Sequence, residues 1–163
     1  MANISFALTT QEFLDGRKTA TRRFWKDIHL ARWQRWYDDG KRLHTAVDKV
    51  TFAGGKKIGQ FVLTARPFLQ PLGHMTNRDL EEEGGMCSTL AEFCDLIGYP
   101  PDAEAAVVKF ARVENEFDCP DCDGGRWLRC IDHTRGDEPV YLLFHVDAED
   151  GRVTGGGWKC IPF

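Results

Sequence analysis

The chain has 163 residues, of which 42% are hydrophobic, and its formal net charge is -4 at pH 7. This length and composition predict one folded domain with its own core, or a domain with a small appendage. No apolar run approaches the roughly 20 residues of a membrane-spanning helix, and the N-terminus lacks a signal-peptide layout. We therefore expect a soluble, cytoplasmic protein without a membrane partner; the oligomeric state is left open.

The patterns along the chain predict mostly strands, interrupted by short helices. In chain order we expect a strand at 4–8, a helix from Thr9 or Thr10 to Gly16, a helix at 30–37, strands at 43–47, 50–52 and 58–64, helices at 76–83 and 88–98, and strands at 105–113 and 140–146. Because strands and helices do not alternate regularly, an α+β small barrel is favoured over a parallel sheet.

The charge is unevenly distributed along the sequence. Residues 1–66 carry thirteen Lys and Arg against six Asp and Glu, a net charge of +7. Residues 67–163 carry eight against nineteen, a net charge of -11. Because the local field governs the capture of a charged ligand, the front half can bind a nucleic acid or nucleotide. The acidic tail would repel a long phosphate backbone, which favours a short ligand over a long duplex.

The basic segment G-R-K-T-A-T-R-R at 16–23 begins where the first predicted helix ends. Amide hydrolysis needs a nucleophile, a group that takes its proton, and a group that stabilises the oxyanion, and Thr21 and Lys18 are candidates for these roles. A lysine loses its proton near neutral pH only where it is buried or crowded by other cations, which the neighbouring arginines can provide. In the alternative interpretation the segment is a solvated turn, and Thr21 is an ordinary strand residue.

Aromatic residues follow the basic segment. Trp25 is the candidate for stacking on a base while nearby cations contact phosphates. Trp33, Trp36 and Tyr37 recur at helical spacing, and for them we expect packing against the core. The expected ligand-binding residues are Arg17, Arg22, Arg23 and Trp25.

The tail contains the pattern C-x2-C-x7-C-x2-H, formed by Cys119, Cys122, Cys130 and His133. Two such pairs can supply four ligands for a structural zinc ion, and Cys160 can replace His133. A redox-active C-x2-C pair, or no metal at all, are the alternatives. Catalytic zinc is disfavoured because protein ligands would fill all four positions.

Several segments occur in an order that is typical of one known family. They are I-S-F-A-L-T (4–9), the G-x-K-x-x-T-x-R pattern at Gly16, Lys18, Thr21 and Arg23, G-K-K-I-G-Q-F-V-L-T (55–64), the step Glu83-Gly84 before S-T-L-A-E-F (88–93), and V-V-K-F-A-R-V (107–113). Residues 1–113 therefore resemble the ASCH family (activating-signal-cointegrator homology), a branch of the PUA-like barrels.

The resemblance implies a PUA-like small β-barrel over 1–113, followed by a Cys-rich β extension over 114–163. It also implies a cleft in which Lys18 and Thr21 face the ligand, which would be RNA, another single-stranded nucleic acid, or a modified nucleotide or nucleoside. One bacterial group of the family hydrolyses acetylated cytidine, and its catalytic residues correspond here to Lys18, Thr21 and Glu83.

The function predicted from the sequence is thus a binding module for RNA or a nucleoside, with zinc in the extension. The alternative is an amidohydrolase acting on an acylated cytidine-type nucleoside through the three catalytic candidates, or a nuclease variant of the same idea. A third hypothesis is a protein-interaction adaptor whose acidic tail mimics the charge of a nucleic acid.

Overall fold

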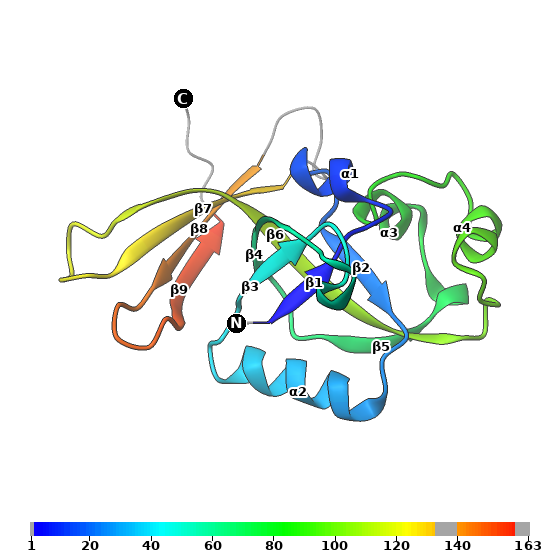
Figure 1. Cartoon of the computed structure of the whole chain (residues 1–163), viewed down its shortest axis with the longest axis horizontal. Helices are drawn as coiled ribbons and strands as arrows, with labels where there is room; N and C mark the ends of the chain where they lie inside the picture. The colour runs from blue at the N-terminus through cyan, green and yellow to red at the C-terminus, as the bar shows by residue number, and fades with distance from the viewer. Residues whose placement is uncertain (1, 133–139, 159–163) are drawn as a thin grey trace.

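The computed structural model describes residues 2–132 and 140–158. These residues form an α+β fold, which confirms the expected class. Its elements are β1 (Asn3–Ser5), α1 (Thr10–Leu14), β2 (Ala20–Arg23), α2 (Asp27–Asp38), β3 (Leu43–Val47), η1 (Thr51–Ala53), β4 (Lys57–Leu63), β5 (Phe68–Pro71), η2 (Leu72–His74), α3 (Asn77–Glu82), α4 (Leu90–Ile97), β6 (Glu104–Asp118), β7 (Arg126–Asp132), β8 (Val140–Val146) and β9 (Val153–Trp158) (Figure 1).

The long strand β6 organises the sheet. The main path of paired strands runs β1-β3-β4-β6-β7-β8-β9, and β2 and β5 also pair with β6. The β1–β3 pair is parallel, and the other pairs are antiparallel. Figure 1 shows β6 crossing the molecule from the β7–β9 extension to the side where α3 and α4 lie. Within the described residues this path is open, so the expected closed barrel is not what these strands form.

An aromatic core lies between the first helices and the sheet. The rings of Phe6 and Phe13 stack with centroids 4.7 Å apart, and Phe61 and Phe110 belong to the same cluster. The helix α2 covers one side of this core with Trp33, which is 6% exposed. Trp36 and Tyr37 pack against the same cluster half-buried, which confirms the expected inward packing of this aromatic stripe.

A second core joins the front half of the chain to the extension. Leu128 and Leu142 from the extension pack with Val62 and Ala111 from the front half. The boundary expected between residues 113 and 114 lies inside β6, which continues to Asp118. The two parts therefore share a strand and a core.

A third, smaller core positions α3 and α4. Leu72, Leu80, Phe93, Cys94 and Ala105 are buried together where these helices meet the start of β6. None of the helices among the described residues combines the length and the apolar character that a membrane span requires.

Candidate functional site

The basic segment is held in place by backbone hydrogen bonds from both ends. The amides of Arg17 and Lys18 both donate to the carbonyl oxygen of Glu12, at 2.9 and 3.0 Å, so the segment folds back against α1. The Thr19 amide donates to the carbonyl of Glu82 at 2.8 Å, which ties the segment to α3. These bonds place the Lys18 side chain inside the protein, where it is 3% exposed. The alternative interpretation as a solvated turn therefore does not apply to Lys18.

Lys18 and Glu83 form a buried ion pair. Lys18 Nζ donates to Glu83 Oε2 at 2.6 Å and to the Glu83 carbonyl oxygen at 2.8 Å. The other carboxylate oxygen, Oε1, accepts from Arg22 Nη1 at 3.0 Å. Since the Arg22 side chain is 1% exposed, one carboxylate serves two buried cations. Hydrogen bonds between charged groups away from water are strong and directional, so this network fixes all three side chains.

The backbone conformation and the packing at position 84 explain why a glycine follows Glu83. Gly84 has φ of +110°, in a region that favours glycine. A Cβ at this position would also lie 3.0 Å from Cβ and Cγ of Glu12, closer than packed side chains normally approach. Glycine therefore lets the end of α3 sit against α1, and this contact points the Glu83 side chain toward Lys18.

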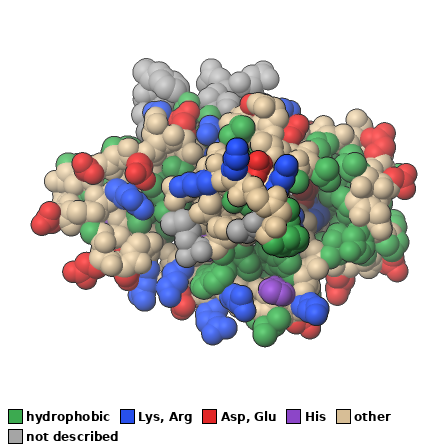
Figure 2. All heavy atoms as spheres, viewed as in Figure 1, with side chains coloured by type: hydrophobic (Ala, Val, Ile, Leu, Met, Phe, Trp, Pro, Cys, Tyr) green, Lys and Arg blue, Asp and Glu red, His purple; other side chains and the backbone are tan. Residues whose placement is uncertain are grey.

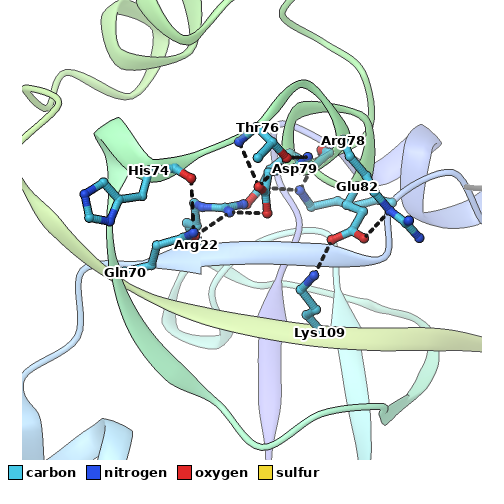
Figure 3. Close-up of polar contacts among 10 residues, drawn as sticks. Arg22, Gln70, His74, Thr76, Arg78, Asp79, Glu82 and Lys109 are labelled. Atoms are coloured by element: carbon cyan, nitrogen blue, oxygen red, sulfur yellow. Dashed lines mark hydrogen bonds and ion pairs between the residues drawn. The ribbon is translucent and has the colours of Figure 1, made fainter.

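The same face of α3 is attached to the sheet by further polar contacts. Arg22 Nη2 donates to Asp79 Oδ1 and to Gln70 Oε1, both at 2.9 Å (Figure 3). Glu82 lies between Lys109 Nζ, at 2.8 Å, and Arg78 Nε, at 3.4 Å. The helix is thus joined to β2 and β6 by charged pairs as well as by its apolar face, and Arg22 links it further to Gln70 on β5.

Burial changes the proton affinity of Lys18 and Arg23. Removal from water lowers the pKa of Lys18, and the charge of Glu83 opposes this shift only in part. Burial also lowers the pKa of Arg23, whose guanidinium donates to the Ser5 carbonyl. A lysine with a lowered pKa reaches its neutral form more easily than a solvated lysine does, and this form can accept a proton.

A cavity of about 280 Å³ lies beside this network. Lys18, Thr21 and Glu83 all line it, together with Arg22 and Arg23, so the cavity brings five of the expected site residues together. The remaining walls are largely apolar and include Phe6, Leu8, Val50, Met86, Phe93 and Leu96. Figure 2 shows hydrophobic side chains gathered over and beside α4 on the face in view.

Two expected ligand-binding residues lie elsewhere. Arg17 is half exposed and pairs with Asp15 at 3.1 Å, outside the lining of the cavity. Trp25 stacks on Trp33 with ring centroids 5.2 Å apart and packs against the aromatic core. Arg17 and Trp25 therefore do not line the cavity, although they lie close to its lining residues in the sequence.

A second group of reactive side chains lies in the extension. The ligand atoms of Cys119, Cys122 and His145 all lie within 4.8 Å of one another, so this group could hold a metal ion. A backbone hydrogen bond at Asp121 is the main cause that lowers the pKa of Cys119. A hydrogen bond with Cys119 raises the pKa of Cys122.

This group differs from the expected set of metal ligands. Cys130 is fully buried in the second core, and burial raises the pKa of its thiol, so it packs as an apolar residue and lies outside the group. His133 and Cys160 lie outside the described residues. His145 was not among the ligands expected from the sequence, because it lies on β8, far along the chain from the C-x2-C pair.

Another buried titratable group lies on β3. His44 is 2% exposed, packs against the rings of both Trp33 and Trp36, and accepts a hydrogen bond at Nδ1 from the Ala2 amide. Burial lowers its pKa to about 4. It also lines a cavity of about 360 Å³ between α2 and the extension.

A comparison of the chain with known protein families, curated proteins and solved structures finds no match. The resemblance to the ASCH family therefore stays a prediction from the sequence.

Proposed function

We propose that the cavity beside Lys18 binds a single nucleoside or nucleotide, either free or as one unit of single-stranded RNA. The observation that carries this proposal is the buried network of Lys18, Glu83 and Arg22 at the wall of a cavity that also contains Thr21. A buried ionisable group with a shifted pKa, such as Lys18, in a concave site is typical of functional sites.

The charges of the cavity favour a ligand with electron-rich oxygen atoms. Among its charged lining residues Lys18, Arg22 and Arg23 are cationic, and Glu83 alone is anionic. The excess of positive charge attracts a phosphate or a carbonyl oxygen, and the low dielectric of a buried site strengthens this attraction.

The apolar part of the wall favours a flat ring. Leu8 is 71% exposed and Leu96 is 47% exposed, and both line the cavity. Nucleobases have apolar faces and polar edges, so apolar side chains can cover the faces while the charged network contacts the edges. The volume of about 280 Å³ is close to the small end of ligand pockets, roughly 300 to 1,000 Å³, and suits one nucleoside.

The resemblance to the ASCH family supports the same proposal and extends it to a PUA-like fold. Lys18, Thr21 and Glu83, which belong to the motifs that carry the resemblance, are among the polar residues that line the cavity. The sequence motif and the cavity therefore both support the proposal that a ligand would bind beside Lys18.

A second candidate function, hydrolysis of an acylated nucleoside, is favoured by the lowered pKa of Lys18. In this reaction the hydroxyl oxygen of Thr21 attacks the amide carbonyl carbon, and neutral Lys18 accepts the hydroxyl proton. Lys18 then donates that proton to the leaving amine, which gives the free nucleoside and an ester on Thr21. Water hydrolyses the ester to a carboxylic acid and restores Thr21. Glu83 holds Lys18 in position throughout.

The extension adds a cofactor to the proposal. We propose that it contains a structural zinc ion held in part by Cys119 and Cys122, because thiolates are ligands that zinc prefers. The ion would stabilise a segment that has few buried residues of its own at this end.

The proposed ligand is tested by calorimetric titration with cytidine, N4-acetylcytidine and a short single-stranded RNA. Lys18→Met keeps the length of the side chain and removes its charge, and Lys26→Met changes an exposed lysine that does not line the cavity. We expect Lys18→Met to weaken binding by about 10- to 100-fold, because one charge-assisted hydrogen bond contributes about 1.5–3 kcal/mol. Equal affinities for the two variants, or no binding of any of the three ligands, would contradict the proposal.

Turnover is tested in the same samples by chromatographic separation of N4-acetylcytidine from cytidine. Thr21→Val should abolish the release of cytidine and retain binding. The matched variant Thr19→Val changes a buried neighbour that does not line the cavity and should keep turnover. Binding without turnover in the unmodified protein would support the binding module over the hydrolase.

A further inference from the structure

The end of β6 meets the end of β8 at the tip of the extension. Cys119 and Cys122 lie in the turn between β6 and β7, and His145 lies near the end of β8. Cys122 Sγ is 3.1 Å from His145 Nε2. Zinc bonds of about 2.3 Å to sulfur and about 2.0 Å to nitrogen, at the tetrahedral angle, place such donors about 3.5–3.8 Å apart. The three donor atoms therefore lie close to the separations that one shared ion imposes.

The imidazole of His145 is held in the orientation that a ligand needs. Its other ring nitrogen, Nδ1, lies 2.8 Å from Thr154 Oγ1 on the neighbouring strand β9. When Nδ1 carries the proton and donates it to this hydroxyl, Nε2 presents its lone pair to the two sulfurs. Ligating histidines in proteins almost always have their second nitrogen held in this way.

Gly125 leaves room around the donor atoms. A Cβ at this position would collide with Cys122 Sγ and would lie 2.9 Å from His145 Nε2. The Gly125 carbonyl also accepts a hydrogen bond of 2.8 Å from the Cys119 amide, which closes the turn. Only glycine therefore allows this turn to bring the sulfurs against the imidazole.

We infer that His145, through Nε2, is the third zinc ligand beside Cys119 and Cys122, and that Thr154 and Gly125 are the residues that position these ligands. This inference rests on the proposed zinc ion and goes beyond it, because it assigns the histidine and the contacts that orient it. The ion would join the β6–β7 turn to β8 and, through Thr154, to β9. A ligand other than these three would complete a tetrahedral site.

The ligand set is tested by elemental analysis of protein purified without chelator. We expect one zinc per chain in the unmodified protein and loss of zinc in Cys122→Ser and in His145→Ala. The controls Cys87→Ser and His74→Ala change residues outside the group and should keep the metal. Retention of zinc in His145→Ala, as in His74→Ala, would overturn the assignment of His145 and leave the proposed zinc ion standing.

Thr154→Val provides a test that does not remove a ligand. Thr154 is exposed, and its hydroxyl lies against Nδ1, the ring nitrogen that faces away from the sulfurs. The variant should therefore fold and bind zinc about 10- to 100-fold more weakly, as measured by competition with a chromophoric chelator. An affinity equal to that of the unmodified protein would overturn the positioning role of Thr154.

The cobalt-substituted protein distinguishes a metal site from a redox pair. Tetrahedral cobalt with thiolate ligands absorbs in the visible range, and Cys122→Ser should weaken the sulfur-to-cobalt band. Metal-free protein that binds neither zinc nor cobalt, and instead forms a reversible Cys119–Cys122 disulfide, would overturn both the ligand set and the proposed zinc ion. These measurements use no nucleoside and do not depend on the cavity beside Lys18.

Discussion

Glu83 is the residue on which the geometry of the cavity depends. It accepts hydrogen bonds from Lys18 and Arg22, both buried, and its charge opposes the loss of the Lys18 proton. A buried ion pair that loses one partner destabilises a protein by about 3–5 kcal/mol, because the remaining charge has no counterion. The same carboxylate therefore holds the fold together at this point and sets the charge that a ligand meets.

His44 should make the stability of the protein depend on pH. Its pKa is about 4 in the folded state and about 6.5 when solvated, so the unfolded chain binds more protons between these values. The free energy of unfolding should therefore fall as the pH decreases from about 6.5 to about 4, by about 3 kcal/mol in total. Urea unfolding at a series of pH values measures this change.

His44→Phe keeps a ring in the same aromatic surroundings and removes the titration. We expect the difference in stability between this variant and the unmodified protein to vary with pH in the stated range. His29→Gln, which changes an exposed histidine on α2, should follow the unmodified protein. Parallel pH profiles for His44→Phe and the unmodified protein would show that His44 binds a proton as readily when folded as when unfolded.

The sequence predicted the residues of the cavity beside Lys18 better than it predicted the possible metal ligands of the extension. Lys18 and Thr21 are three positions apart in one segment, and the family pattern supplied Glu83, so their place in one cavity was within reach of sequence reasoning. His145 was not, because the strand pairing that brings β8 to the β6–β7 turn leaves no trace in the spacing of cysteines. Cys130 has suitable spacing but alternates inward with Leu128 on β7, and both are fully buried.

The first turn of α3 links the N-terminal cap of this helix to the buried network beside the cavity. Thr76 Oγ1 accepts from the Asp79 amide, and Asp79 Oδ2 accepts from the Thr76 amide, which together form a capping box. Asp79 also accepts from Arg22, so the cap and the buried network share one carboxylate.

Thr76→Ala should destabilise the protein by about 1 kcal/mol, because it removes the side-chain acceptor at the start of α3. Thr76→Ser keeps the hydroxyl and should remain close to the unmodified protein. Denaturant unfolding measures the difference, and titration with the nucleoside shows whether the loosened Asp79 also weakens the ligand. Equal stability of the alanine and serine variants would mean that the cap contributes nothing to the fold.

The elements that were predicted correctly have strong local signals. The expected strands at 43–47 and 140–146 have the bounds of β3 and β8. The expected strand at 50–52 was wrong, because a 3-10 turn covers Thr51–Ala53 and its apolar Phe52 is 94% exposed. The pattern also missed β5, since Pro71 indicated a break, yet an edge strand pairs there with β6 and tolerates proline.

The chain as a whole behaves as a unit held together by its second core. A protein truncated after residue 113 would expose Val62 and Ala111, which the extension covers in the full chain, and would leave β6 without β7. We expect this truncated chain to aggregate or to lack cooperative thermal unfolding, because exposed apolar surface costs about 25 cal/mol per Å².

Circular dichroism during heating distinguishes the outcomes of the truncation. The full chain should unfold in one transition, since the two parts share β6 and a core. A truncated chain that unfolds cooperatively at the temperature of the full chain would show that residues 1–113 are an independent domain.

The strand shared by all these regions limits how the protein can respond to a ligand. β6 pairs with β2 next to the cavity at Ala106–Lys109 and with β7 toward the tip of the extension at Arg112–Asp118. Because β6 is one strand through both pairings, a rotation of the extension against the cavity would have to bend it and disturb the hydrogen bonds on either side of the register shift between Val113 and Asn115. We therefore expect a ligand beside Lys18 to meet a backbone that stays fixed on binding. Only side chains at the rim of the cavity should adjust.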